Sequence, residues 1–267
     1  MVSIIIPLYN AEAYIEKTIQ SCLNQTYKNI EIIVVDDCSV DKSYKIVDCI
    51  MKKEYPVIKL YKNEVNSGLI FTVNKGLEYC KGRYIITLGN DDTLKEKHIE
   101  NMISIMKQKD CSFIYCGSDY IDENDNIIGK SNTLDIGSYK KMMARRNIIN
   151  SCGLMVNRKY LDMVRGYPSD LGFKNYGEWY LWIRLLGLAP AVYTNEIRSN
   201  YRIHSLNLTK TLLKKENIIE TCNYNLLCMK LASGELGFRI FQRGYLKLYR
   251  LAYRMKMNFM FFKRGLD

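Results

Sequence analysis

The first 120 residues alternate between short apolar runs and longer segments in which apolar residues recur every three or four positions. Runs such as "VSIIIPLY" and "IEIIVV" have the length and composition of buried strands. The longer segments have the spacing of helices that bury one face. We expect strands over residues 2–9, 30–35, 57–61, 83–88 and 111–116, and helices over 11–24, 41–51, 67–80 and 96–107.

The order of these elements predicts the fold class. Strands that alternate with helices indicate an α/β fold, and strands that are apolar throughout indicate a mostly parallel sheet with helices on both faces. Asp41 is a candidate N-cap for the second helix, and Ser67 or Asn66 for the third. Beyond about residue 120 the alternation weakens, and we expect loops and helices there.

Polar residues follow three of the expected strands. The carboxyl ends of parallel strands meet at one edge of a sheet, where open α/β sheets bind ligands, so we expect these polar clusters to converge. Any single cluster has a structural explanation, because Asp and Asn are common turn residues. The clusters are Pro7, Tyr9 and Asn10; Asp36, Asp37, Ser39 and Asp41; and Asn90, Asp91 and Asp92.

Several carboxylates at one edge repel a bare phosphate. A divalent cation would allow the carboxylates and a phosphate to lie at the same edge, because Mg²⁺ and Mn²⁺ bind through one or two carboxylates together with substrate phosphates. The clusters therefore predict a nucleotide diphosphate held through Mg²⁺ or Mn²⁺ near Asp91 and Asp92. Neither G-x-x-x-x-G-K-[ST] nor a G-x-G-x-x-G after a strand occurs, which argues against a P-loop NTPase and a dinucleotide-dependent dehydrogenase.

Composition and charge narrow the setting. The chain of 267 residues has no run of 18 or more apolar residues, and "MVSIIIPLYN" lacks a basic leader and a small-residue cleavage site, so we expect neither a membrane-spanning helix nor a secretory signal. Nine cysteines without a C-x-x-C pair indicate reduced thiols, so we expect a cytoplasmic protein. The formal net charge is +11, and residues 221–267 carry nine basic against two acidic residues.

The basic C-terminal tail predicts a partner of its own. Its basic residues recur every three or four positions with aromatic residues between them, which is typical of a basic amphipathic helix. We expect this helix to dock on an anionic membrane surface, which makes the protein peripheral on the inner face of the cytoplasmic membrane. A packed helix with a solvated basic edge is the alternative. The residues are Arg239, Arg243, Lys247, Arg250 and Arg254.

Three blocks of sequence resemble the family 2 glycosyltransferases. "SIIIPLYNAEAYIEKTIQSCLNQTYKNIEIIVVDDCSVDKS" and "NEVNSGLIFTVNKGLEYCKGRYIITLGNDD" look like the family's nucleotide-sugar-binding half. "RGYPSDLGFKNYGEWYLWIRL" resembles its acceptor-side motif, and "YRIHSLNLT" its downstream Tyr-Arg-x-His segment. The resemblance implies a GT-A fold over 1–210, with a nucleotide-sugar-binding half at 1–118 and an acceptor-binding half at 119–210. The basic helical extension occupies 211–267.

The resemblance also implies roles for the donor-side residues. Asp36 or Asp37 would accept the uracil N3–H. Asp91 and Asp92 would bind the metal and the ribose, and His204 would be a further metal ligand or a diphosphate contact. The full nucleotide-sugar-binding set is Pro7, Tyr9, Asn10, Asp36, Asp37, Ser39, Gly68, Asn74, Asn90 and Asp91, in which Gly68 and Asn74 shape the helix under the diphosphate.

On the acceptor side, the resemblance implies that Glu178 is the catalytic base. A glutamate needs no large pKa shift to be ionised near pH 7. Trp179 is expected to line the acceptor pocket, and Arg184 to support the base helix through an ion pair. We give His98 no role and expect Trp182 to be a core residue.

Three positions depart from the family pattern. The metal motif, usually Asp-x-Asp-Asp, begins here with Gly89, so one carboxylate is missing. Val73 replaces the basic residue that usually precedes Asn74. Glu178 stands where the family usually has Asp, and its longer side chain changes the reach of the base.

The resemblance implies an inverting, metal-dependent hexosyltransferase. It would move a hexose or N-acetylhexosamine from a nucleotide diphosphate sugar, with UDP favoured, to a glycan or lipid-linked acceptor in surface polysaccharide synthesis. An inactive sugar-nucleotide-binding relative is the main alternative. A nucleotidyltransferase lacks its basic phosphate loop here, and a nucleic-acid-binding role is opposed by the acidic edge. The sugar, the acceptor and the oligomeric state are left open.

Overall fold

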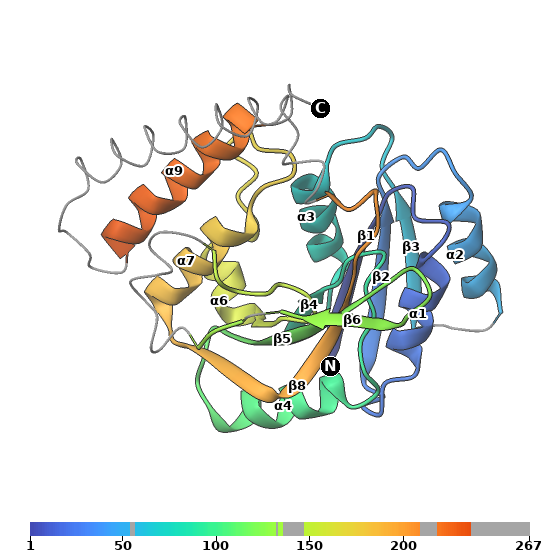
Figure 1. The fold of residues 1–267 in the computed structure, drawn as a ribbon, viewed down its shortest axis with the longest axis horizontal. Helices are drawn as coiled ribbons and strands as arrows, with labels where there is room; N and C mark the ends of the chain where they lie inside the picture. Colours follow the sequence, from blue (N-terminus) through green and yellow to red (C-terminus); the bar gives the residue numbers. More distant parts are fainter. Residues whose placement is uncertain (54–56, 132, 136–146, 209–217, 236–267) are drawn as a thin grey trace.

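The structure is a computed structural model, and it describes residues 1–53, 57–131, 133–135, 147–208 and 218–235. An eight-stranded mixed sheet runs through its centre (Figure 1). Strands β1, β2, β3 and β4 are parallel to one another, β7 is antiparallel to β4 and β5, β6 is antiparallel to β5, and β8 is parallel to β5. The strand order is β3 (Ile58–Lys62), β2 (Ile30–Asp36), β1 (Val2–Leu8), β4 (Tyr84–Thr87), β7 (Met155–Asn157), β5 (Phe113–Ile121) and β6 (Ile127–Lys130), and β8 (Ala191–Arg202) pairs with β5.

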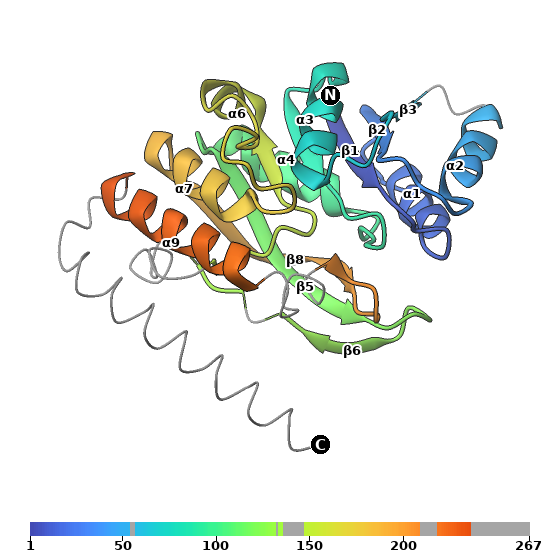
Figure 2. The same cartoon turned by 90° about the horizontal axis from the view of Figure 1, so that it is seen from above.

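Helices cover both faces of the sheet (Figures 1 and 2). Successive residues of β1 point to opposite faces, so Ile4 and Ile6 join one hydrophobic cluster and Ile5 joins the other. The first cluster receives α1 (Ile15–Leu23), α2 (Ser43–Lys52) and α4 (His98–Gln108). The second receives α3 (Leu69–Tyr79), α6 (Arg158–Met163), α7 (Glu178–Leu188) and α9 (Ile218–Glu235).

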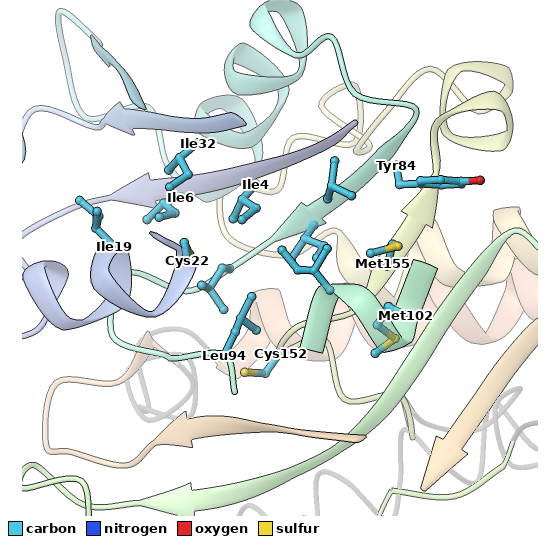
Figure 3. Close-up of a cluster of buried hydrophobic side chains, with 14 of the residues drawn as sticks. Ile4, Ile6, Ile19, Cys22, Ile32, Tyr84, Leu94, Met102, Cys152 and Met155 are labelled. Atoms are coloured by element: carbon cyan, nitrogen blue, oxygen red, sulfur yellow. The ribbon is translucent and has the colours of Figure 1, made fainter. Parts of the chain in front are cut away.

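Figure 3 shows part of the first hydrophobic cluster, where side chains of β1 and β2 pack against α1. Ile4 and Ile6 of β1 lie beside Ile32 of β2, and Ile19 and Cys22 of α1 approach from the helix side. All five are fully buried. Fully burying an aliphatic side chain contributes about 1.5–3 kcal/mol, so strands this apolar hold the loops at their ends rigidly.

The predicted fold class is confirmed: the chain is α/β with a mostly parallel central sheet. The first five strands and four helices lie within a few residues of their expected positions. The expected cap of α3 is wrong, because neither Ser67 nor Asn66 caps it; the carboxylate of Asp37 accepts the N–H groups of Ser67 and Gly68 instead.

The expectation of only loops and helices after residue 120 is also wrong, since β6, β7 and β8 lie there. β7 has only three residues, and β6 is mostly exposed, so neither has a buried apolar run. β8 carries Arg198 and Arg202, whose charges are satisfied inside the fold by Asp119 and Asp125. A strand that carries such paired charges lacks the apolar pattern from which strands are predicted.

The expected extension from residue 211 includes α9, which packs against α7. The hydroxyl of Tyr224 accepts the backbone N–H of Tyr180 at 3.0 Å, and Cys228 and Ala232 are fully buried. The basic residues of the predicted membrane-binding helix, 239–254, lie outside the described residues. Among the residues that are described, no helix is both long and apolar enough to cross a membrane.

Candidate functional site

The three polar clusters meet at the carboxyl ends of β1, β2 and β4, as predicted. The backbone N–H of Asn10 donates to the Ser39 hydroxyl at 3.1 Å, and the Asn10 side chain accepts the N–H of Val40 at 2.9 Å. The amide of Asn90 donates to the carbonyl of Tyr9 at 3.4 Å. These contacts join three loops that are distant in sequence, and we call the surface that they form the rim.

Asp37 lies at the rim but is fully engaged by the protein. One oxygen accepts the Asn63 amide at 2.9 Å and the N–H of Ser67 at 2.8 Å, and the other accepts the N–H of Gly68 at 2.8 Å. The carboxylate is buried. Asp37 therefore ties the turn before α3 to the end of β2.

Asp36 and Pro7 belong to strands β2 and β1 themselves and precede the loops that form the rim. Asp36 accepts the N–H of Ser39 at 3.2 Å and lies 3.9 Å from the ammonium of Lys62, and its side chain is fully buried. Pro7 is half-buried within β1, whereas Tyr9 beyond it is 45% exposed. Tyr9 is thus the large side chain of this cluster that is open to a ligand.

Gly68 and Asn74 join the donor half to the chain around residues 166–175. Gly68 has φ +88°, and a Cβ there would lie 2.8 Å from the Cβ of Lys174, so only glycine fits. The Asn74 amide donates to the carbonyl of Tyr167 and accepts its N–H, both at 2.9 Å. Val73 on the same helix is fully buried in the core.

The N-terminus of α3 is not an open anion site. Besides the two N–H groups held by Asp37, the N–H of Ile70 donates to the carbonyl of Lys174 at 3.0 Å. The N–H of Leu69 donates to the Asn175 side chain at 3.2 Å. The backbone donors that open a helix are therefore consumed within the protein.

The turn after β4 presents two carboxylates to one point. A Cβ on Gly89 would lie 2.9 Å from Oδ1 of Asp91 and 2.8 Å from Oδ2 of Asp92. The two carboxylate oxygens therefore face the space that a side chain at position 89 would enter. Among the described residues, no hydrogen-bond donor contacts Oδ1 of Asp91.

Asp92 is the more deeply buried member of this pair. Its Oδ1 accepts the backbone N–H of Arg202 at 2.9 Å. The thiol of Cys152, which donates to the carbonyl of Asn200 at 3.6 Å, lies close enough to affect the pKa of Asp92. Burial, followed by the charge of Asp91, raises the pKa of Asp92 well above its ordinary value. A positive charge placed between the two carboxylates would oppose both effects.

His204 and Asn207 hold the other oxygen of Asp91. Nε2 of His204 lies 2.8 Å from Oδ2 of Asp91, and the Asn207 amide donates to the same oxygen at 3.1 Å. The ring of Tyr14 packs on the His204 imidazole with centroids 4.8 Å apart. The structure thus brings His204 to Asp91, as a metal ligand or a diphosphate contact would require.

Arg202 is fully buried and connects the acidic turn to the β5–β6 hairpin. Its guanidinium donates to the carbonyl of Asp91 at 2.8 Å, to the carbonyl of Asp122 at 2.7 Å and to the carboxylate of Asp125 at 2.6 Å. It also lies 5.0 Å from the centroid of the Tyr14 ring. A buried arginine with this many partners fixes the turn that carries Asp91 and Asp92.

Glu178 is the first residue of α7 and faces the same region. Ser151 donates to its Oε2 at 2.8 Å, and Tyr167 lies close enough for the glutamate charge to raise the tyrosine pKa. The hydroxyl of Tyr167 donates to Thr87 at the end of β4. Burial raises the pKa of Glu178, with the Ser151 hydrogen bond opposing the shift.

Residues 151 and 152 connect the glutamate to the acidic turn. Ser151 donates to Glu178, and its neighbour Cys152 lies close enough to Asp92 to affect the pKa of that carboxylate. Glu178 and Asp92 are therefore neighbours of two consecutive residues.

The remaining expected residues lie behind the rim. Trp179 and Trp182 are buried in the second hydrophobic cluster, and Arg184 is half-buried on the same helix. His98 is buried and bonds to the carbonyl of Gly153 at 2.7 Å, and burial lowers its pKa to about 4. Trp182 is the core residue that was expected, and His98 is a neutral structural residue.

Three residues of the site were not expected from the sequence: Ser151, Arg202 and Asn207. Ser151 has no motif around it. Asn207 belongs to the "NLT" triplet, which matches only a glycosylation acceptor, and Arg202 lies on a strand that was not predicted. For Arg202 and Asn207 the signal was the family resemblance of "YRIHSLNLT", from which only the histidine was taken.

Within the described part of the chain, no group of three or more His, Cys, Asp or Glu side chains is arranged to hold a metal ion. Two carboxylates with oxygens facing one point nevertheless fit Mg²⁺ or Mn²⁺, because these cations take one or two carboxylates and complete their shell with phosphates and water. Asp91 and Asp92 are the residues that would hold the cation.

Comparison with known proteins identifies the family of the chain. The chain matches the family model for glycosyl transferase family 2 over residues 3–162. The Escherichia coli protein named UDP-Glc:alpha-D-GlcNAc-diphosphoundecaprenol beta-1,3-glucosyltransferase WfgD is 32% identical over 218 residues, which are 80% of this chain and 82% of the relative.

Two solved structures show the same fold at low sequence identity. S. aureus TarS in complex with UDP-GlcNAc has a TM-score of 0.68 and 16% identity, and the match covers 85% of this chain and 66% of that chain. The mannosyltransferase PcManGT from Pyrobaculum calidifontis, in complex with GDP-Man and Mn²⁺, has a TM-score of 0.59 and 14% identity, with 96% and 83% covered. The chain therefore belongs to glycosyltransferase family 2 and has the GT-A-like fold that its sequence predicted.

Proposed function

We propose that the protein transfers a hexose or N-acetylhexosamine from a UDP-sugar to a hydroxyl of a lipid-linked glycan, with inversion at the anomeric carbon. One observation carries the proposal. Asp91 and Asp92 share the turn after β4, and Ser151 holds Glu178 while the adjacent residue Cys152 lies close enough to Asp92 to affect its pKa. A donor diphosphate and an acceptor hydroxyl need carboxylates in these two places.

UDP is the favoured nucleotide for two reasons. The relative WfgD is named for UDP-Glc, and TarS was solved with UDP-GlcNAc. Tyr9 is open to stack on a base, and of the two aspartates expected to accept its N3–H, Asp36 is the one we assign, because both oxygens of Asp37 are held by the protein. Both aspartates are buried, so base binding requires the loops that Asn10 and Ser39 hold together to move. Of the two, Asp36 has fewer donors to lose.

Glu178 acts as the general base. The glutamate takes the proton from the acceptor hydroxyl while the oxygen attacks the sugar carbon and the bond to the diphosphate breaks. Its raised pKa makes it a stronger base than an ordinary carboxylate, provided that the pH keeps it ionised. Ser151 holds one of its oxygens and leaves Oε1 for the acceptor.

Asp91 and Asp92 hold the divalent cation, which when bound supplies positive charge for the leaving diphosphate. Their own contribution is positional, because Arg202 fixes the turn from both sides through the Asp91 carbonyl and the Asp92 carboxylate. The missing carboxylate at Gly89 leaves room for these two side chains to approach the cation.

Calorimetric titration with UDP, GDP and ADP, each with Mn²⁺ and with EDTA, tests the donor site. We expect binding of UDP that depends on Mn²⁺ and is at least about tenfold tighter than binding of GDP or ADP. Equal binding of all three nucleotides would contradict the assignment of UDP. Absence of binding to any of them would contradict the donor site itself.

An inactive sugar-nucleotide-binding relative is a second candidate. Gly89 removes one carboxylate of the family's metal motif, and one oxygen of Asp91 is held by His204 and Asn207. This function predicts Mn²⁺-dependent UDP binding without release of UDP from any UDP-sugar. A screen of UDP-sugars with undecaprenyl-linked acceptors separates the two candidates.

The membrane partner is proposed on sequence grounds. A lipid-linked acceptor places the reaction at a membrane, and the basic residues of 239–254 would hold the protein on anionic lipid. Flotation with vesicles rich in anionic lipid should therefore require residues 236–267. If a chain truncated after Glu235 floats equally well, the tail is not the membrane-binding element.

A further inference from the structure

Asn207 has no role in the function proposed so far, yet it is buried at the centre of the site with both ends of its amide in use. Its Nδ2 donates to Oδ2 of Asp91 at 3.1 Å and to the carbonyl of Arg202 at 3.0 Å. Its Oδ1 accepts the N–H of His204 at 2.7 Å. A flipped amide would set oxygen against two acceptors and nitrogen against a donor, so its orientation is unambiguous.

The same turn fixes the tautomer of His204. The backbone N–H of Leu206 donates to Nδ1 of the imidazole at 3.2 Å, so Nδ1 carries no proton. The ring proton of the neutral imidazole is then on Nε2, where it is donated to Oδ2 of Asp91 at 2.8 Å. In the metal-free protein Nε2 is therefore a hydrogen-bond donor to Asp91.

We propose that Asn207 is a positioning residue of the donor site, which together with His204 holds Oδ2 of Asp91 so that Asp91 meets the cation through Oδ1. The inference rests on the proposed function, and it gives His204 the role of a hydrogen-bond donor to Asp91 in the metal-free protein. Oδ1 is the oxygen that faces the Gly89 space together with Oδ2 of Asp92.

Two donors on one oxygen have a clear consequence for the other. The Asp91 carboxylate cannot rotate without breaking both hydrogen bonds, and groups that orient a metal-binding side chain typically change metal affinity by about 10–100-fold when they are removed. Asn207 also anchors His204 through its backbone, so loss of Asn207 would release both donors. Asn207 therefore contacts Asp91 directly and also supports the second donor to the same oxygen.

The first measurement needs no ligand. The chain contains only two histidines, His98 and His204, so ¹⁵N-histidine NMR of the metal-free protein gives two sets of ring signals, and a His204→Gln variant assigns them. We expect His204 to show the Nε2–H tautomer, because Nδ1 accepts the N–H of Leu206. Asn207→Ala should give a mixture of tautomers, with His98 unchanged.

The second measurement is calorimetric titration with MnCl₂ and UDP. We expect Asn207→Ala to weaken Mn²⁺-dependent UDP binding by about tenfold or more, and Asn207→Asp to weaken it further, because a carboxylate would then face Asp91. Gln25→Ala is the matched control: Gln25 is also a buried amide with three hydrogen bonds, to the backbones of Ser21, Lys95 and Ile99. Its affinity should stay within about twofold of wild type.

The outcomes separate this inference from the proposed function. If Asn207→Ala leaves both the His204 signals and the affinity unchanged, or if Gln25→Ala weakens binding equally, Asn207 has no positioning role. If the wild-type chain binds no nucleotide, the proposed function fails, and the NMR comparison still decides whether Asn207 orients His204. An Nδ1–H tautomer in the wild-type protein overturns the inference directly.

Discussion

Two acidic turns follow the strands that flank β1, and they use their carboxylates in opposite ways. In the turn after β2, both oxygens of Asp37 accept hydrogen bonds from Asn63, Ser67 and Gly68. In the turn after β4, the donors to Asp91 among the described residues all bond to Oδ2, and its Oδ1 faces the Gly89 space. Both residues are aspartates in the turn after a parallel strand, and they differ in the hydrogen-bond donors that surround them.

The difference teaches how to separate structural from functional carboxylates at a ligand-binding edge. A carboxylate with donors on both oxygens has little left to offer a ligand, whereas one held on a single side is oriented and still available. Glu178 belongs to the second kind, because Ser151 holds its Oε2 and no described residue donates to Oε1. We therefore expect Asp37 to matter for stability and Asp91 and Glu178 for activity.

The largest expected effect is on Glu178. Glu178→Gln keeps the size and the Ser151 contact but removes the base, and general bases typically contribute about 10²–10⁴-fold to rate. We expect kcat to fall within that range in a UDP-release assay, with Mn²⁺-dependent UDP affinity within about twofold of wild type. Glu196→Gln, at an exposed position on β8, is the control. Loss of UDP affinity as large as the loss of kcat would remove Glu178 from the role of base.

The next effect compares the two turns directly. Asp37→Asn places an amide against the N–H groups of Ser67 and Gly68 and removes charge-assisted hydrogen bonds, so we expect the free energy of unfolding to fall by about 2–3 kcal/mol. Asp91→Asn should change it by less than about 1 kcal/mol, because relief of repulsion from Asp92 offsets the lost hydrogen bonds. Urea denaturation measures both.

For nucleotide binding we expect the opposite order of effects for the same two variants. Asp91→Asn should weaken Mn²⁺-dependent UDP binding by more than about tenfold, since it changes a proposed ligand of the cation. Asp37→Asn, measured where it is folded, should bind within a few fold of wild type. Equal losses of binding in the two variants would contradict the distinction between the turns.

The sequence predicted the parallel half of the fold because its strands are apolar throughout and its turns carry Asp and Asn. It could not predict which carboxylates are free, since the donors to Asp37 lie at residues 63–68 and those to Asp91 at residues 204 and 207. The second half was harder because β8 carries buried charges, and Arg202 resembles a surface residue until Asp125 and the Asp91 carbonyl are placed beside it. Long-range hydrogen bonds leave no periodic trace in a sequence.

A smaller effect is expected at Gly89. Gly89→Asp restores the family's carboxylate, but its Cβ would lie 2.8 Å and 2.9 Å from carboxylate oxygens of Asp92 and Asp91. Without metal we expect a loss of about 1–2 kcal/mol in unfolding free energy from crowding and repulsion. With Mn²⁺ the thermal stabilisation should exceed that of wild type. Gly89→Asn separates size from charge: it should show the loss without the gain, and a gain in this variant would contradict a cation between the carboxylates.

The smallest expected effect concerns the pKa of Glu178. Burial raises the pKa of Glu178 and the Ser151 hydrogen bond opposes that shift, so Ser151→Ala should raise the pKa further. A base with a higher pKa is protonated at a higher pH, so the acidic limb of the kcat profile should move to higher pH and activity on that limb should fall about two- to fivefold, the equivalent of about 0.5–1 kcal/mol for one hydrogen bond. The alkaline plateau should change little, and Ser151→Thr should restore the wild-type limb. A uniform loss at every pH would mean that Ser151 supports the fold and does not tune the base, and Glu178 would then be oriented by α7 alone.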